Sequence, residues 1–180
     1  MKVFVLYGTT DGQTRKIARF VSDLLIHQGH SVELLCAADA GDLALARFDA
    51  VIVAGSVHTG GFQEDLIDVL RGVAARLDDM PNFFLAVSLT AAGDDAEDWA
   101  GLQGCVDRFT AATGWTPRQV AHVAGAFRFT QYDFFRSWAM RWIAHQKGET
   151  VDPHEDKEYT DWAALKQTVT DWAEMAGLTR

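Results

Sequence analysis

The chain has little cysteine. Its 180 residues include only two, Cys36 and Cys105, which lie far apart in the sequence and outside any CxxC spacing. Neither a disulfide framework nor a zinc site is therefore indicated. A reducing cytoplasm is the compartment that we expect.

Positive charge and long apolar runs are also scarce. The 16 Lys and Arg residues are outnumbered by 25 Asp and Glu, which gives a net charge of −9. Because such a chain repels a phosphate backbone, no nucleic-acid partner is expected. No apolar run approaches the ~18 residues of a membrane span, and Met1-Lys2 leads directly into a strand-length run instead of a signal-type segment. We expect neither export by a recognisable signal nor a membrane-spanning helix.

What the sequence does contain is an alternation of short apolar runs with segments of helical period. Hydrophobic residues make up 48% of the chain, enough to build a packed core at this length. The runs typical of strands cover 3–7, 31–36, 50–55, 83–88 and 120–126. The segments with helical spacing of apolar residues are 17–24, 66–77, 99–109 and 162–176, and a short helix is expected over 41–47.

This alternation predicts an α/β fold. Strands that are apolar throughout and are joined by helices are typical of a parallel sheet that is covered on both faces. The sequence contains no internal repeat, low-complexity tract or linker. Residues 1–180 are therefore predicted to form a single domain, a doubly wound five-stranded parallel sheet.

The stretch YGTTDGQT at 7–14 follows the first predicted strand. In such a sheet, ligands bind beyond the carboxyl ends of the strands. Small hydroxyls, backbone N–H groups and a helix N-terminus at this point are suited to hold a phosphate without a cation. The stretch lacks the GKS or GKT ending of a nucleotide triphosphatase loop and the GxGxxG of a dinucleotide site. The alternative interpretation is an ordinary helix cap with turn residues.

Several stretches resemble a known family. Residues 1–125 are similar to a flavodoxin-type domain, whose phosphate loop has hydroxyl residues at its first, third and sixth positions. Here these are Thr9, Asp11 and Thr14, so Asp11 departs from the general pattern. The stretch DGQTRKIA (11–18) resembles one branch, the bacterial quinone-dependent protoporphyrinogen IX dehydrogenases. The further stretches similar to that branch are GSVHTGGFQEDL (55–66), GAFRFTQYDFFRSW (125–138) and YTDW (159–162).

This resemblance implies a flavodoxin-like fold that binds FMN. The phosphate is expected on 9–14, and the isoalloxazine ring is expected between the loops after the third and fourth strands, 56–61 and 89–95. The cofactor-binding residues that it implies are Thr9, Thr10, Asp11, Gly12, Gln13, Thr14, Ser56, Val57, His58, Thr59, Gly60, Ser88, Leu89, Thr90, Ala91 and Ala92.

No side chain is expected to act as a catalytic nucleophile or base. Gly60 and Gly61 permit a close approach of the backbone to a flat ring, although an ordinary loop before a helix has the same composition. Ser56 and His58 are candidates to contact the flavin or a substrate carboxylate, and the alternative for His58 is a solvated loop histidine. The GxSxG elbow of a nucleophilic triad is missing from the sequence.

The remaining histidines show no metal-ligand spacing, and no metal is expected. His27 and His30 flank a helix end, His122 alternates within a strand, and His154 lies in an acidic run. The acidic stretch DDAED (94–98) is expected to be a solvated loop that caps the next helix.

The segment 126–150 is predicted to be a helical insertion near the fifth strand. Its aromatic residues share one face at helical spacing, and it resembles the long-chain insertion of the family. Such a face packs on its own domain, forms a dimer or lies in a lipid interface. Lipid contact would make the protein peripheral on the cytoplasmic face of the inner membrane. The residues expected to contact substrate or membrane are Arg128, Phe134, Arg136, Trp138, Arg141 and Trp142.

The function implied by the resemblance is the FMN-dependent oxidation of protoporphyrinogen IX to protoporphyrin IX in haem biosynthesis, with a quinone as acceptor. Arginines of the insertion suit porphyrin propionates, whereas the acidic stretch 94–98 counts against an anionic substrate on that side. Three alternative functions stay open. They are a flavodoxin-type electron carrier whose acidic surface docks basic partners, an NAD(P)H-quinone reductase, and a binding module without the cofactor.

Overall fold

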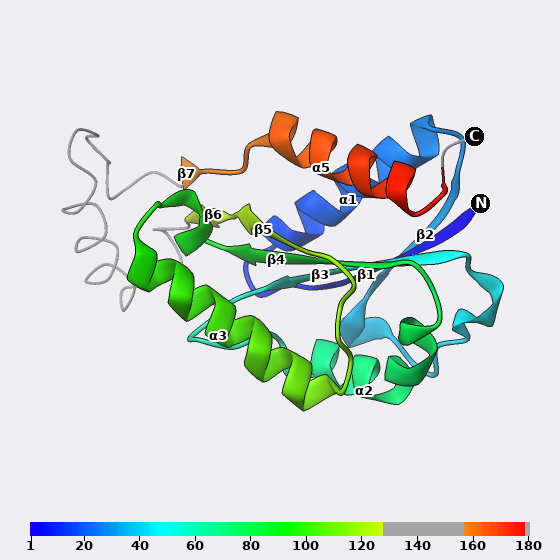
Figure 1. The fold of residues 1–180 in the computed structure, drawn as a ribbon, viewed down its shortest axis with the longest axis horizontal. Helices are drawn as coiled ribbons and strands as arrows, with labels where there is room; N and C mark the ends of the chain where they lie inside the picture. The colour runs from blue at the N-terminus through cyan, green and yellow to red at the C-terminus, as the bar shows by residue number, and fades with distance from the viewer. Residues whose placement is uncertain (128–156, 179–180) are drawn as a thin grey trace.

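A computed structural model describes residues 1–127 and 157–178. Within these ranges the chain forms a five-stranded parallel sheet with helices on both faces (Figure 1). The strands of this sheet are β1 (Lys2–Gly8), β2 (Ser31–Cys36), β3 (Ala50–Ser56), β4 (Asn82–Ser88) and β5 (Val120–Ala124). Their order is β2-β1-β3-β4-β5. The predicted doubly wound sheet is confirmed.

The helices lie in two layers (Figure 1). The helices of the described residues are α1 (Gln13–His27), α2 (Glu64–Asp78), α3 (Ala96–Thr113) and α5 (Trp162–Met175). The pair α1 and α5 covers one face of the sheet, and the pair α2 and α3 covers the other. Val3 and Val5 belong to the core under α1 and α5, whereas Phe4 and Leu6 belong to the core under α2 and α3. Because both faces are buried, the central strands β1, β3 and β4 are apolar at most of their positions.

The helix predicted over 41–47 is wrong. The chain forms two isolated 3₁₀ turns instead, η1 (Ala37–Asp39) and η2 (Leu45–Arg47). Leu45 is the buried residue of 41–47, so this segment offers no continuous apolar face to pack. A short helix without such a face is not stable, since tertiary packing supplies most helical stability.

The fifth strand is shorter than predicted. Strand β5 ends at Ala124, and Gly125 leaves the sheet: its N–H donates to Ser88 O at 2.9 Å, and its carbonyl accepts from Tyr159 N–H at 3.0 Å. The next residues form β6 (Ala126–Phe127), which pairs antiparallel with β7 (Lys157–Glu158). This small ribbon therefore lies at the carboxyl end of the sheet, beside the end of β4 (Figure 1).

The predicted insertion 126–150 lies outside the described residues from 128 onward. The same holds for the candidate contacts of substrate or membrane, which are Arg128, Phe134, Arg136, Trp138, Arg141 and Trp142. Within 1–127 and 157–178, no helix combines the length and apolar character that crossing a bilayer requires.

Candidate functional site

The loop between β1 and α1 forms a tight turn that leads into the helix. Gly12 stands at the N-cap position with φ of 87°, a left-handed conformation that favours glycine. Its N–H donates to Thr9 Oγ1 at 2.9 Å. No side chain caps α1. The ordinary helix-cap interpretation requires a Thr or Asp side chain to accept from the first turn, and the structure does not support it.

Two buried polar atoms of this loop have no hydrogen-bond partner. Thr14 is 1% exposed, and both its Oγ1 and the Oδ1 of Asp11 are unpaired. An unpaired buried polar group costs about 1–3 kcal/mol, so its presence needs an explanation. The N–H groups at a helix N-terminus carry a partial positive charge and favour an anion. An uncapped helix with an unpaired, buried hydroxyl in its first turn therefore fits a phosphate.

Gln63 joins this loop to the loop after β3. Its Nε2 lies 3.1 Å from Thr10 Oγ1, 2.7 Å from Ser56 Oγ and 3.1 Å from the Ser56 carbonyl oxygen. Its Oε1 accepts from Ser56 N–H at 3.3 Å. A Cβ added to Gly8 would lie 2.9 Å from the same Oε1, so a glycine is needed at that position for the amide to fit.

This bridge stands where the strand order reverses. Strands β1 and β3 are neighbours, but the helices that follow them, α1 and α2, cover opposite faces of the sheet. The crevice between the ends of two such strands is where doubly wound proteins bind their ligands. The sequence prediction did not include Gln63, because a glutamine before a helix has no pattern that indicates a tertiary contact.

The loop after β3 contains a tight turn over His58–Gly61. His58 N–H donates to Gly61 O at 2.8 Å, and Gly61 N–H donates to His58 O at 3.1 Å. Thr59 and Gly60 both have positive φ, 48° and 83°. Two successive positive φ values are typical of a type I′ turn, and they strain a β-branched residue such as Thr59. The positive φ of Gly60 suits a glycine, and the close approach of Gly60 and Gly61 to a flat ring stays a prediction.

Helix α3 holds this turn from outside. Arg108 Nη2 donates to the Gly60 carbonyl oxygen at 2.9 Å, and Cys105 Sγ lies 3.4 Å from the same oxygen. Cys105 is buried and Arg108 contacts it as well, at 3.3 Å. The carbonyl of Gly60 is therefore engaged by α3. Sequence reasoning identified neither contact, since both come from a helix distant in the chain.

The loop after β4 begins beside the loop after β3. Val57 N–H donates to Val87 O at 2.8 Å. The predicted residues of this loop follow, with Ser88 Oγ accepting from Ala91 N–H at 3.1 Å and with the 3₁₀ turn η3 (Thr90–Ala92) directly after Leu89. The three predicted loops thus leave adjacent strands, β1, β3 and β4, at one end of the sheet.

The acidic stretch caps α3 as predicted. Asp95 Oδ1 accepts from the N–H groups of Glu97 and Asp98 at 2.9 and 3.1 Å. Since α3 begins at Ala96, the stretch contributes the first turn of the helix and only its first two residues are loop. Trp99 then donates from Nε1 to Gly93 O at 2.9 Å and packs edge-on against His122 at 5.2 Å. Burial lowers the pKa of His122, which favours its neutral form.

The side chain of Gln13, another predicted cofactor residue, has a partner near the end of the chain. Its Nε2 donates to Thr160 Oγ1 at 2.9 Å. The group of Gln13 that is suited to bind a ligand is therefore its backbone N–H, one of the N–H groups at a helix N-terminus that have no partner within the helix. In the part of the chain that the structure describes, no three His, Cys, Asp or Glu side chains are grouped to hold a metal ion.

Comparisons of the sequence with known proteins give matches over most of the chain. The family described as the flavodoxin domain matches residues 4–154. A protoporphyrinogen IX dehydrogenase (quinone) from Leishmania major is 28% identical over 173 residues, which are 96% of this chain and 74% of that protein. A protein of the same name from Escherichia coli strain K12 is 26% identical over 179 residues, which are 99% of this chain and 97% of that protein.

Solved flavodoxin structures share the fold. A short-chain flavodoxin associated with a bacterial microcompartment matches with a TM-score of 0.60 at 15% identity, covering 98% of this chain and 99% of its own. The flavodoxin of Streptococcus pneumoniae TIGR4 matches with a TM-score of 0.56 at 16% identity, covering 97% of this chain and 99% of its own. At these identities the likeness is one of fold.

Proposed function

This chain belongs to the flavodoxin domain family, and on that premise we propose that it binds FMN and oxidises protoporphyrinogen IX to protoporphyrin IX with a quinone as acceptor. The relatives named for this activity align with nearly the whole chain, including its C-terminal part. The observation that carries the cofactor assignment is the unpaired, buried hydroxyl of Thr14 in the uncapped first turn of α1.

The residues divide into two groups by the part of FMN they would hold. Thr9, Thr14 and the backbone N–H groups of Asp11, Gln13 and Thr14 suit the phosphate, because hydroxyls and helix N-terminal amides bind an anion without a cation. The loops that begin at Ser56 and Ser88 suit the ring. The chemistry supplied by the cofactor is hydride transfer from the porphyrinogen to the quinone.

In this proposal the side chains of the protein bind FMN and orient the loops around it. Gln63 ties the phosphate loop to Ser56, so the two parts of the site keep a fixed separation. Arg108 holds the carbonyl of Gly60 toward α3, which fixes the orientation of the neighbouring peptides in the turn. Preorganised backbone groups stabilise charge on a reacting ring without reorganisation cost. We assign no side chain as an indispensable base.

A second candidate function is electron transfer without a substrate of its own. The net charge of −9 and the acidic first turn of α3, which directly follows the third loop of the site, favour docking of a basic partner protein. In that case reduced cofactor would pass electrons to the partner, and porphyrinogen would not react faster in its presence.

Two measurements test the proposal in order. The purified protein is incubated with FMN and desalted, and a retained flavin absorption spectrum is expected. The loaded protein is then mixed anaerobically with protoporphyrinogen IX and a quinone, and porphyrin fluorescence is followed. Its rate is expected to exceed those of the protein-free reaction and of a Thr14→Val variant, which is expected to retain less flavin.

The outcomes separate the candidates. A retained flavin with no acceleration of porphyrin formation would favour the electron carrier, while acceleration of quinone reduction by NAD(P)H alone would favour a quinone reductase. A protein that stays colourless after desalting would contradict the cofactor assignment and all three functions that depend on it.

A further inference from the structure

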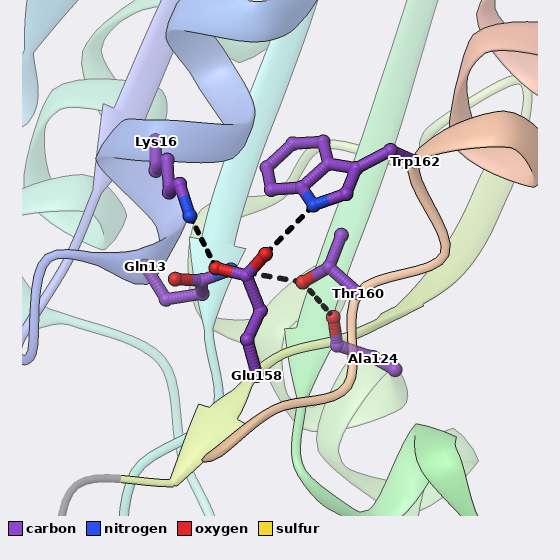
Figure 2. Close-up of polar contacts among 6 residues, drawn as sticks. All are labelled: Gln13, Lys16, Ala124, Glu158, Thr160 and Trp162. Carbon is purple, nitrogen blue, oxygen red and sulfur yellow. Dashed lines mark hydrogen bonds and ion pairs between the residues drawn. The ribbon is translucent and has the colours of Figure 1, made fainter. Parts of the chain in front are cut away.

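The stretch 159–162 contacts the first turn of α1, although the two are distant in sequence. It follows β7 and leads into α5, and Figure 2 shows Thr160 bonded to Gln13, and Trp162 bonded to Glu158 beside Lys16. The most buried of these contacts is a chain of two hydrogen bonds. Gln13 Nε2 donates to Thr160 Oγ1 at 2.9 Å, and Thr160 Oγ1 donates to the carbonyl oxygen of Ala124 at 2.7 Å.

This chain of hydrogen bonds connects the end of the sheet to the candidate phosphate loop. Ala124 is the last residue of β5, and Gln13 is the first residue of α1. Gln13 and Thr160 are 9% and 8% exposed. Because both are buried, each polar atom depends on the other, and loss of the hydroxyl would leave a buried amide and a strand carbonyl without this partner.

A second set of contacts surrounds this pair but is exposed. Glu158 forms an ion pair with Lys16 and accepts from Trp162 Nε1 at 2.7 Å. The Lys16 ammonium also lies over the Trp162 ring, 5.3 Å from its centroid, and Phe20 packs on that ring at 4.9 Å. The Lys16 side chain is 60% exposed, and exposed ion pairs contribute little. The Gln13 side chain also hydrogen-bonds to Glu158, and the buried bond to Thr160 is the contact that connects Gln13 to the sheet.

We propose that Thr160 is a positioning residue for phosphate binding at the β1–α1 loop. No side chain caps α1, so the orientation of its first amides depends on what holds the first turn. Gln13 lies between Gly12, which makes the turn, and Thr14, whose hydroxyl is buried and unpaired. By holding Gln13 from the sheet, Thr160 sets the direction of the amides and of the Thr14 hydroxyl. The inference rests on the proposed function, since FMN provides the phosphate.

The coupling must act in both directions. If the hydrogen bond between Thr160 and Gln13 favours the loop geometry that binds the phosphate, phosphate binding must in turn stabilise that hydrogen bond, because linkage is reciprocal. Riboflavin presents the same ring without a phosphate and so distinguishes this role from a general contribution to the fold.

The test compares FMN and riboflavin affinity in three variants. Thr160→Val keeps the shape and removes the hydroxyl, and it is expected to weaken FMN binding by roughly 10-fold. Riboflavin affinity is expected to change much less. Thr160→Ser keeps the hydroxyl and is expected to restore the FMN preference. Thr168→Val is the matched control, because the Thr168 hydroxyl bonds within α5, to Ala164 O, and it is expected to leave both affinities unchanged.

Wild-type protein is measured first, so that the two proposals fail separately. Absence of FMN binding by the wild type would contradict the proposed function. If the wild type binds FMN, an unchanged FMN affinity in Thr160→Val, or an equal loss for FMN and riboflavin, would contradict the positioning role.

Hydrogen exchange of the wild type provides a measurement that does not depend on folding of the variant. FMN is expected to slow exchange of the amides of residues 159–161, and riboflavin is expected to have little effect on them. Equal exchange at these amides with and without FMN would overturn the inference even if Thr160→Val does not fold.

Discussion

Thr14 is almost completely buried, and its hydroxyl has no hydrogen-bond partner. Threonine in a helix commonly bonds to the carbonyl four residues earlier, as Thr168 does to Ala164 O at 2.9 Å. The corresponding carbonyl of Thr14 belongs to the turn before the helix, where Thr10 lies. The hydroxyl has no partner in the described structure, and the proposed phosphate contact would supply one.

Replacing Thr14 by valine should separate these two roles. Thr14→Val removes the hydroxyl at nearly constant volume, so we expect the FMN-free protein to keep its melting temperature or gain slightly, because an unpaired buried polar atom is lost. FMN binding is expected to weaken by roughly 10-fold or more. Thermal melts without ligand and fluorescence titration with FMN check the two effects. Thr14→Ser is the control that should retain binding, and a marked loss of stability in the FMN-free Thr14→Val protein would contradict the assignment.

Gln63 provides a second residue-level prediction, based on charge. Gln63→Glu places a carboxylate near Thr10 and Ser56, where the amide Nε2 now donates. We expect FMN affinity to fall by roughly 10-fold or more and to recover partly at high salt, because the added charge repels the phosphate. Riboflavin affinity should fall less, since only the bonds between the loops are lost. Titrations of both ligands at two ionic strengths measure this difference.

Gln63→Ala is the matched variant for that test. It removes the same bonds without adding charge, so FMN and riboflavin should be weakened to a similar extent and without salt dependence. If Gln63→Glu also weakened both ligands equally, Gln63 would not lie near the phosphate.

The sequence indicated some of these residues and not others for a physical reason. Thr14 and Gly12 were predicted because hydroxyls, glycine and a helix start are adjacent in the chain, and the unusual φ of Gly12 follows from that turn. Gln63 and Thr160 act through partners distant in sequence, Thr10 and Gln13 respectively. A pattern along the chain carries no information about such contacts.

At the scale of elements, prediction succeeded where a local rule decides the structure. The acidic stretch before α3 was expected to cap it, and Asp95 does so with bonds to two residues of the first turn. The five strands were predicted from their apolar runs. The structure of 41–47 depends instead on which of its residues the fold can bury. The end of β5 depends on the hydrogen bond between Gly125 and Tyr159. Both are effects of tertiary structure, which a local pattern does not contain.

The junction of β7 with α1 and α5 should make stability depend on pH. Burial alone would raise the pKa of the Glu158 carboxyl, but the hydrogen bonds from Lys16 and Trp162 are among those that outweigh it and lower that pKa. A carboxyl whose pKa is lower in the folded state stabilises the protein above its unfolded pKa of about 4.3. That contribution is lost as the pH falls through the folded pKa.

Glu158→Gln is therefore expected to lower the melting temperature by roughly 1–3 °C at pH 7. The difference from the wild type should shrink below about pH 4, where the wild-type carboxyl becomes protonated as well. Melting curves of the wild type and of Glu158→Gln, recorded between pH 4 and pH 7, check this pH dependence. Glu174→Gln removes an exposed carboxylate at the far end of α5 and controls for net charge. A difference that is independent of pH would show that Glu158 acts through packing alone.

At the scale of the whole molecule, the site is a consequence of topology. The loops at 9–14, 56–61 and 88–92 are separated by helices in the sequence, but they leave strands that are neighbours in the order β1-β3-β4. Because all five strands are parallel, their carboxyl ends meet at one edge of the sheet. The residues that return the chain to α5 complete the same edge, where Thr160 contacts Gln13. The position of the site could therefore be predicted from the strand order that the family resemblance implies.

A site assembled in this way exists only in the folded chain, so its ligand should stabilise the whole molecule. Free FMN at one hundred times its dissociation constant stabilises the folded state by about 2.7 kcal/mol. For a chain of this size that corresponds to an increase in melting temperature of roughly 5–10 °C. The increase should continue with FMN concentration, and riboflavin at the same concentrations should give less because it lacks the phosphate. Thr14→Val melted with the same FMN series is the control that should shift least. A melting temperature that does not depend on FMN concentration would contradict the binding of FMN at the start of α1.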